Sequence, residues 1–308
     1  MMAIVYELNQ PHPLDAPSTR PEPKPPLVKV ITSHEFDALP NISQEGRNGL
    51  AALEPAEMNF VELYPAFIIG SFAVPDKADP TADPDRMSFY LDADRLVFID
   101  DGTVATDMLQ KVAASGILTK ATTSHCLYAL MKTLIADDFT WFSLMEEGME
   151  KVEEAMLDHT ENVSSQTIMG YRRAAMRMGS YYQQIAVMAD LIADNENKVM
   201  SREEARAFSH VAAHANHLAD RAEVLREYSL QLRELHQTQI DLKQNSTMQI
   251  LTIATVMFAP LTLVTGWFGM NLTVLPGLDW PYMSITIIVL AALMITVMIL
   301  FFKRKNWL

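Results

Sequence analysis

A polar tripeptide, Gly269-Met270-Asn271, stands between two apolar segments of the chain. The first segment, residues 248–268, carries no charged side chain, and the second covers residues 282–302. Each is long enough to cross a bilayer once, which takes about 20 residues. The side-chain amide of Asn271 can accept hydrogen bonds from the waters around a cation. An asparagine held between two membrane-length segments, in a loop too short to be a domain, therefore indicates the mouth of an ion pathway.

The first apolar segment differs from an ordinary lipid-facing helix. Pro260 removes one helical hydrogen bond and usually kinks a membrane helix, although neighbouring helices can compensate. Hydroxyl side chains at this depth either bond back to their own helix or face a polar interior. The segment contains four of them, Thr252, Thr255, Thr262 and Thr265. The second segment is mostly aliphatic, as expected of a helix in contact with lipid.

Basic residues indicate how the two segments are oriented. Lys303, Arg304 and Lys305 follow the second segment, whereas the loop between the segments has Asp279 as its one charged residue. Positively charged residues that flank membrane segments are concentrated on the cytoplasmic side. We therefore predict a multi-pass membrane protein whose two termini are both cytoplasmic.

The chain is acidic, with 38 Asp and Glu against 24 Lys and Arg and a formal net charge of −14 over 308 residues. This balance excludes nucleic acid as an expected partner, because phosphate contacts need clustered Lys and Arg. It favours cations near the surface. The single cysteine, Cys126, excludes an intrachain disulfide and a multi-cysteine zinc site.

No sequence motif indicates an enzyme. Ser124, His125 and Cys126 are adjacent, whereas the members of a catalytic triad converge from separate positions. Neither a phosphate-binding loop nor a zinc-protease helix motif occurs in the sequence. We therefore expect no catalysis, no bound cofactor and no coupling to ATP.

The part before the apolar segments is predicted to be a small mixed α/β domain followed by long helices. Proline-rich composition without periodicity predicts a flexible tail over residues 1–28. Residues 60–74 and 87–99 are rich in Phe, Tyr, Val and Ile, which predicts short strands, with a hairpin turn at residues 92–95. Helical patterns predict two long helices over residues 123–157 and 167–193.

A further helix is predicted from residue 201 into the first apolar segment, on the order of 100 Å long at 1.5 Å per residue. Its apolar or small residues alternate steps of three and four, which is the spacing of a coiled-coil seam. They are Phe208, Val211, Ala215, Leu218, Ala222, Leu225, Ser229 and Leu232. A symmetric bundle of several copies would bury this seam. Antiparallel packing inside one chain is the alternative.

The residues around the tripeptide resemble the CorA family of divalent-cation channels, which also includes the zinc transporter ZntB. The similarity covers roughly the last 100 residues, judged from motif spacing. Besides the tripeptide and the basic end of the chain, the matching positions include Asn245, Met248, Leu251, Thr252, Pro260, Leu261, Thr262 and Gly266.

This resemblance implies a homopentamer in a bacterial inner membrane, with a cytoplasmic α/β domain, a long helical stalk and two transmembrane helices per subunit. Five copies of Gly269-Met270-Asn271 would form the selectivity filter. The pore would be lined by Asn245, Met248, Leu251, Thr252, Thr255, Ala259 and Thr262. The predicted divisions of the chain are a tail (1–28), an α/β part (29–122), a helical hairpin (123–200), the stalk (201–247), the pore helix (248–268), the outer loop (269–281), the second span (282–302) and a basic tail (303–308).

The pore residues suit a hydrated ion. Mg²⁺ loses its waters reluctantly, so a ring of Asn271 carbonyls would bind the ion with its waters in place. Met248 and Leu251 would form an apolar constriction that closes by dewetting. Two departures from the family pattern weaken the link to magnesium. Ala259 replaces a frequent bulky methionine, and Asp279 is the outer loop's only acid.

A third departure lies in the stalk. His210 falls where magnesium-gated members of the family resemble one another in having a regulatory Asp, and His214, His217 and Asp220 follow on the same helical face. Imidazole suits Zn²⁺, Co²⁺ or Ni²⁺ better than Mg²⁺. One hypothesis is that this stripe binds a softer regulatory metal. The alternative is an ordinary solvated or interfacial face.

Three functions follow from this reading. The first is a channel or transporter for Mg²⁺ and Co²⁺. The second is a zinc transporter of the ZntB type, which the histidines and the acid-poor loop favour. The third is a membrane-anchored coiled-coil scaffold or metal sensor without transport. The threonine-rich segment and the polar mouth disfavour a scaffold, since a plain anchor needs neither.

Overall fold

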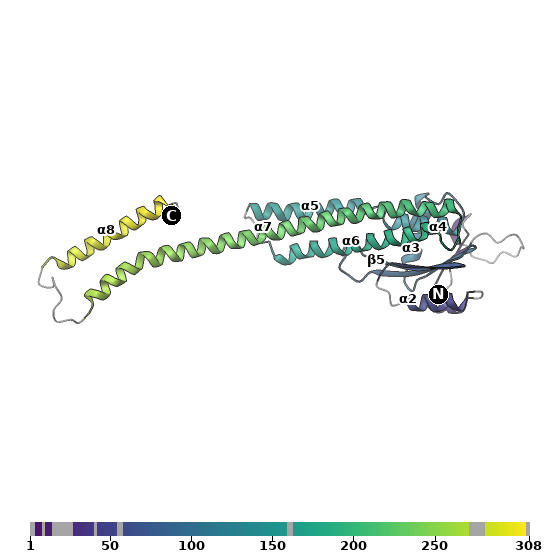
Figure 1. Ribbon diagram of the computed structural model, residues 1–308, viewed down its shortest axis with the longest axis horizontal. Helices are drawn as coiled ribbons and strands as arrows, with labels where there is room; N and C mark the ends of the chain where they lie inside the picture. Colours follow the sequence, from purple (N-terminus) through teal and green to yellow (C-terminus); the bar gives the residue numbers. More distant parts are fainter. Residues whose placement is uncertain are drawn as a thin grey trace, which may run out of the picture. The chain divides into compact units, whose positions relative to one another are not determined.

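The computed structural model describes residues 4–7, 10–13, 27–39, 42–53, 58–158, 163–270 and 281–305. The chain divides into two units, Met1–Arg233 and Glu234–Leu308. The first unit holds a sheet, several helices and the start of the longest helix, and the second holds the rest of that helix and one more (Figure 1).

A seven-stranded sheet organises the first unit. Its order is β2-β1-β3-β7-β6-β5-β4, and β3 with β7 is its one parallel pair. The strands are β1 (Ile4–Glu7), β2 (Gln10–Pro13), β3 (Leu27–Ile31), β4 (Phe60–Tyr64), β5 (Phe67–Val74), β6 (Asp85–Leu91) and β7 (Arg95–Ile99). The predicted hairpin at Asp92–Arg95 joins β6 to β7. Asp92 Oδ1 fixes this turn, because it accepts hydrogen bonds from the backbone N–H groups of Asp94 and Arg95.

The helices are α1 (Ser33–Asp37), α2 (Gln44–Leu53), α3 (Val104–Ser115), α4 (Thr123–Leu134), α5 (Asp138–Leu157), α6 (Ser165–Asp194), α7 (Arg202–Phe268) and α8 (Met283–Arg304). Of these, α2, α3, α4 and α6 contact the sheet. Figure 1 shows β5 between α2 on one face and α3 and α6 on the other. Every residue of β5 is buried, as expected of a strand covered on both faces. On the α2 side, Leu50 packs with Phe67, Ile69 and Tyr90.

Two segments differ from the sequence-based predictions. The expected flexible tail, residues 1–28, contains β1 and β2, because Val5 and Tyr6 pair with Lys29 and Val28 and so complete the edge of β3. The single helix expected over residues 123–157 is broken between α4 and α5. At the first turn of α5 the buried carboxylate of Asp138 forms an ion pair with Lys77, and an acidic side chain is favoured at a helix N-terminus.

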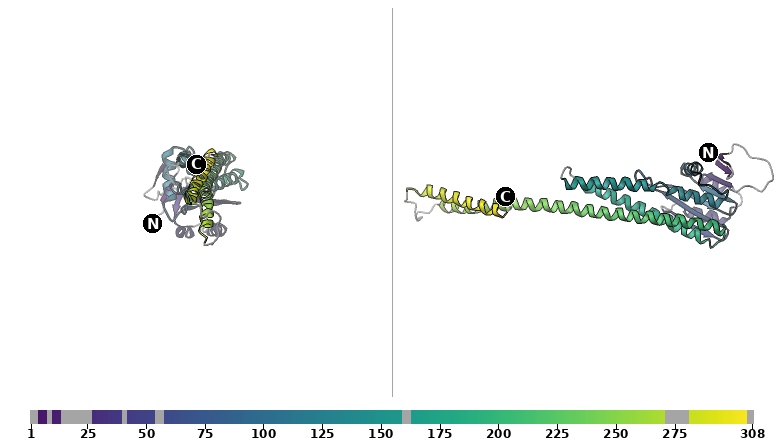
Figure 2. Two further views of the ribbon diagram at one scale, coloured as in Figure 1. Left: turned by 90° about the vertical axis from the view of Figure 1, so that its left-hand side faces the viewer. Right: turned by 90° about the horizontal axis from the view of Figure 1, so that it is seen from above.

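Within the first unit, α5, α6 and the first part of α7 lie side by side (Figures 1 and 2). All eight residues of the predicted seam, from Phe208 to Leu232, are buried within one chain. Arg221 of α7 forms an ion pair with Glu146 of α5 at 2.8 Å, and the Tyr228 hydroxyl donates to Glu153 at 2.5 Å. Packing inside one chain therefore buries the seam, with α7 antiparallel to α6 and parallel to α5, and a bundle of copies is not needed for it.

Candidate functional site

The predicted pore residues lie on one continuous helix. α7 runs for 67 residues, with Pro260 inside it. At 3.6 residues per turn, steps of three and four bring seven side chains to one face. These are Asn245, Met248, Leu251, Thr252, Thr255, Ala259 and Thr262, and each is exposed in the single chain.

The other membrane helix covers the opposite face of α7. Figures 1 and 2 show α8 alongside the C-terminal part of α7. The least exposed residues of α7 in this stretch are Ile253, Ala254, Met257, Pro260, Leu261 and Val264. At 100° per residue these positions are centred on the side of the helix away from Thr255 and Ala259. The apolar α8 (Figure 1) thus leaves the threonine-bearing face of α7 uncovered in a single chain.

The threonine hydroxyls on this face use their protons within their own helix. Thr252, Thr255 and Thr262 each donate to the carbonyl four residues earlier, at 2.8, 2.8 and 2.9 Å. A hydroxyl that donates to its own helix keeps its acceptor lone pairs. The face therefore presents oxygen acceptors, which suit the outward-pointing hydrogens of a cation's waters and do not suit an anion.

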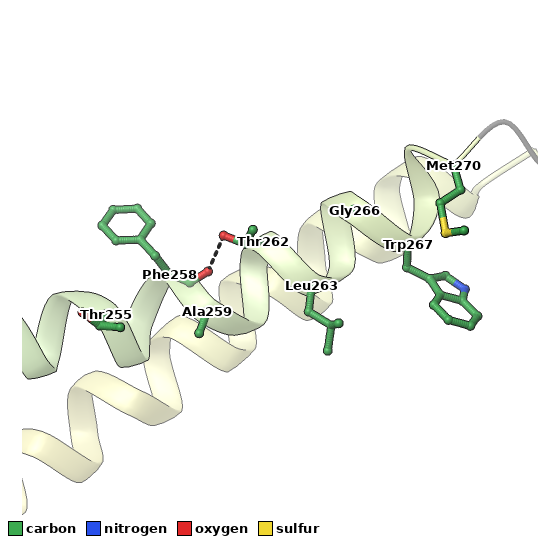
Figure 3. A pocket seen from close by; sticks show the side chains of 8 residues that line it. All are labelled: Thr255, Phe258, Ala259, Thr262, Leu263, Gly266, Trp267 and Met270. Carbon is green, nitrogen blue, oxygen red and sulfur yellow. Dashed lines mark hydrogen bonds between the residues drawn. The ribbon is translucent and has the colours of Figure 1, made fainter.

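Small side chains hollow this face near the end of the helix. The hollow has a volume of about 720 Å³ and is open along α7. Figure 3 shows Thr255, Ala259, Thr262 and Gly266 along it, with Trp267 and Met270 at the mouth end. Because Ala259 and Gly266 carry little or no side chain, the backbone itself forms part of the hollow's floor.

The tripeptide is described in part. The Gly269 N–H donates to the Thr265 carbonyl at 2.9 Å and closes the last turn of the helix. A Cβ at Gly269 would lie 2.8 Å from the same oxygen, which is too close, so the turn requires glycine. Met270 is half exposed. Asn271 lies outside the described residues, as does Asp279.

The histidine stripe does not form a metal site within one chain. His210, His217 and Asp220 are exposed, and His214 is half-buried. The rings of His214 and His217 lie 5.8 and 6.2 Å from the ring of Phe139. Among the residues that the structure describes, no group of three or more His, Cys, Asp or Glu is placed to hold a metal ion.

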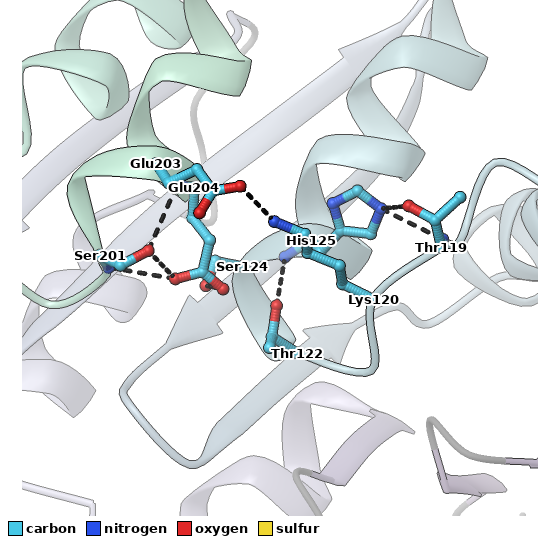
Figure 4. A network of polar contacts seen from close by, with 8 residues as sticks. All are labelled: Thr119, Lys120, Thr122, Ser124, His125, Ser201, Glu203 and Glu204. Atoms are coloured by element: carbon cyan, nitrogen blue, oxygen red, sulfur yellow. Dashed lines mark hydrogen bonds and ion pairs between the residues drawn. The ribbon is translucent and has the colours of Figure 1, made fainter.

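The side chains of the adjacent Ser124 and His125 contact different partners (Figure 4). Ser124 donates to Glu204 Oε1 at 3.3 Å, and His125 Nε2 lies 3.2 Å from the Thr119 hydroxyl. Cys126 is buried, and burial raises the pKa of its thiol to about 12. These contacts do not assemble a nucleophile with a base.

Glu204, which was not among the residues predicted from the sequence, caps the start of α7. Its carboxylate accepts from the backbone N–H and hydroxyl of Ser201, and Ser201 Oγ accepts from the Glu204 N–H (Figure 4). Burial alone would raise the pKa of Glu204, but hydrogen bonds from Ser201, Thr122 and Ser124 hold it below its usual value. The pattern Ser-x-x-Glu at the start of α7 is the capping box that would have revealed it.

Comparison with known proteins identifies the family. The family described as CorA-like Mg²⁺ transporter protein matches residues 48–304. The cobalt/magnesium transport protein CorA of Thermotoga maritima is 23% identical over 255 residues, which are 82% of this chain and 72% of that protein.

Two solved structures share the fold. The CorA magnesium transporter of Methanocaldococcus jannaschii superposes with a TM-score of 0.81 at 18% identity, over 100% of this chain and 99% of that one. The ZntB cytoplasmic domain of Vibrio parahaemolyticus reaches 0.56 at 8% identity, over 77% and 97%. These likenesses confirm the predicted α/β part, long helix and two apolar helices, of which α7 and residues Ile285–Arg304 are long and apolar enough to cross a membrane. The chain therefore belongs to the CorA-like Mg²⁺ transporter family, as a membrane-inserted transporter of divalent cations and not an enzyme.

Proposed function

We propose that this protein conducts Mg²⁺ and Co²⁺ through a pore that several copies of α7 enclose, five copies in the arrangement that the family resemblance implies. The supporting observation is the uncovered face of α7. It carries hydroxyl acceptors and lies away from α8. The acceptor lone pairs that remain on these hydroxyls find hydrogen-bond donors in water and not in lipid, and copies that turn the face toward a common axis place it in water.

The order of side chains suggests how an ion would travel. Asn271 would hold the hydrated ion at the mouth, and Thr262 and Thr255 would accept hydrogen bonds from its waters below. Met248 and Leu251, each about two-thirds exposed in the single chain, would close the pore by excluding water. Asn245 would ring the inner exit. Because Mg²⁺ dehydrates reluctantly, none of these residues needs to replace a water in the ion's shell.

Flux into liposomes tests this proposal. Purified protein is reconstituted, and uptake of Mg²⁺, Co²⁺, Ni²⁺ and Zn²⁺ is compared side by side at two pH values. Asn271→Ala should abolish Mg²⁺ and Co²⁺ uptake without changing the size of the purified oligomer. Uptake that survives this substitution would contradict the role of Asn271, and the absence of flux for every ion would favour a scaffold.

Zinc is the alternative cargo. It is favoured by the exposed His210 and His217, since imidazole binds softer metals. Zn²⁺ uptake that exceeds Mg²⁺ uptake and responds to a pH gradient would support it. A separate test of metal binding by the histidine stripe uses the double variant His210→Ala/His214→Ala. If this variant binds Zn²⁺ as the wild type does, these two histidines are not metal ligands.

A further inference from the structure

A second hollow lies in the first unit, where α6 meets the loop between β5 and β6. Its volume is about 260 Å³, and none of its lining residues belongs to the α7 face described above. Arg177, Ser180 and Gln184 enter it from α6, at steps of three and four on one helical face. Asn59 and Ala82 line it from the other side.

The walls of this hollow are held in place by a closed set of amide hydrogen bonds. Asn59 is buried, and its side chain accepts from the Ala73 N–H at 3.0 Å. Gln184 Oε1 accepts from the backbone N–H and from the side chain of Asn59, both at 2.9 Å. Gln184 Nε2 donates to Ser180 Oγ at 3.1 Å. The amide oxygens are thereby used, and the pocket is formed before any ligand arrives.

Three described groups of the lining keep hydrogen-bonding capacity. The buried Tyr181 hydroxyl makes no hydrogen bond within the described part of the chain and can donate or accept, whereas Ser180 and Arg177 offer donors. Ser180 Oγ accepts from Gln184, so its proton is available to a ligand. Within the described part of the chain, the Arg177 guanidinium makes one long hydrogen bond, to the Ala82 carbonyl at 3.5 Å, and no ion pair. Arginine has five N–H donors and no acceptor. A ligand that satisfies Ser180 and Arg177 must therefore be an acceptor.

The segment around the hollow carries charges of both signs. Among the described residues that line the hollow, Arg177 is the one that carries a charge. Two neighbouring charges in the loop already have partners: Lys77 is paired with the buried Asp138, and hydrogen bonds from Thr81 lower the pKa of Asp79. Asp76 and Asp83 of the loop, and Asp85 at the start of β6, are exposed and do not line the hollow.

We propose that this hollow binds a small oxyanion, the phosphate or carboxylate group of a soluble metabolite, through Arg177 and Ser180. Guanidinium binds both groups with paired, charge-assisted hydrogen bonds. The volume admits a small molecule. The bound anion would bridge α6 and the loop between β5 and β6. Because α6 packs beside α7, the site would link the binding of this ligand to the position of α6.

Binding of two probes to the full-length protein in detergent tests this inference. Inorganic phosphate and succinate are each titrated by calorimetry against chloride at matched ionic strength. Divalent cations are removed beforehand, because both probes chelate them. The matched pair of variants is Arg177→Gln and Arg173→Gln. Arg173 is an exposed arginine one turn earlier on α6 that does not line the hollow.

At least one probe should bind the wild type and Arg173→Gln, with affinity reduced on the order of tenfold or more in Arg177→Gln. Ser180→Ala should weaken it by several-fold, as expected for one neutral hydrogen bond. Binding of phosphate alone identifies a phosphorylated ligand, and binding of succinate alone identifies a carboxylate. If neither probe binds, or if both arginine variants lose affinity equally, the inference is wrong.

Discussion

Replacing Thr255 and Thr262 together by valine separates the pore role of these residues from their helical role. Valine has nearly the shape of threonine but lacks the hydroxyl. Both hydroxyls donate to carbonyls four residues earlier, so the substitution removes the same local bond from the helix at each site. At each site the substitution also removes the oxygen acceptor that the hydroxyl presents on the uncovered face of α7.

The expected loss of flux depends on the hydrogen bonds that the two hydroxyls accept. If each hydroxyl accepts one hydrogen bond from a water of the passing ion, its loss costs about 1 kcal/mol. Two losses amount to about 2 kcal/mol, which corresponds to a flux on the order of 30-fold lower. The local helical bonds contribute little by themselves, because a threonine that bonds back to its helix barely stabilises it.

Thr296→Val is the matched control. Thr296 lies exposed on α8, and its hydroxyl donates to the Ala292 carbonyl at 2.8 Å, the same local geometry as at Thr255. Stopped-flow Mg²⁺ uptake into liposomes is compared for the two variants at equal oligomer content. The control should transport like the wild type. Equal losses in both variants, or an unchanged flux in the double variant, would refute the assignment of this face to the ion path.

Three other substitutions test separate parts of the structure. Leu218→Ala should lower the unfolding free energy by about 2–5 kcal/mol, because Leu218 is buried. Val224→Ala, at an exposed position, should change it by no more than about 0.5 kcal/mol. Similar denaturant midpoints for the two variants would contradict burial of the seam within one chain. The lowered pKa of Glu204 means that its ionised form adds stability above its ordinary pKa of about 4.3 and loses it as pH falls through the lowered value. Melting temperatures between pH 7 and pH 3 should therefore fall less steeply in Glu204→Gln, and parallel curves would exclude this role. Ala259→Met should narrow the hollow of α7 and reduce Mg²⁺ uptake several-fold with an unchanged melting temperature, whereas wild-type uptake would place Ala259 away from the ion.

Much of the architecture could be predicted from local sequence properties. Apolar composition and length mark the two membrane segments, and a high content of Phe, Tyr, Val and Ile marks β5 and β6. The tripeptide and the basic end of the chain indicated the family, and the comparisons confirm it. The role of Asn271 stays a prediction, as it lies outside the described residues.

Other features depend on partners that are distant in sequence. Periodicity showed that Leu218 belongs to a seam, but only packing shows that α5 and α6 of the same chain bury it. Asp138, which begins α5 after the break, is buried beside Lys77, a counter-ion about sixty residues earlier in the chain. Likewise, the local sequence of β1 predicts a tail, and β1 is a strand because it pairs with β3.

The same distinction applies to the ion path. By itself, the sequence determined that α7 is a membrane-length helix with threonines along it, because composition and helical period are properties of one segment. Which face of that helix α8 covers, and therefore which threonines stay open, was decided by the tertiary structure. The physical reason is that two helices choose their contact face by the fit of side chains from both, and neither segment carries that information alone.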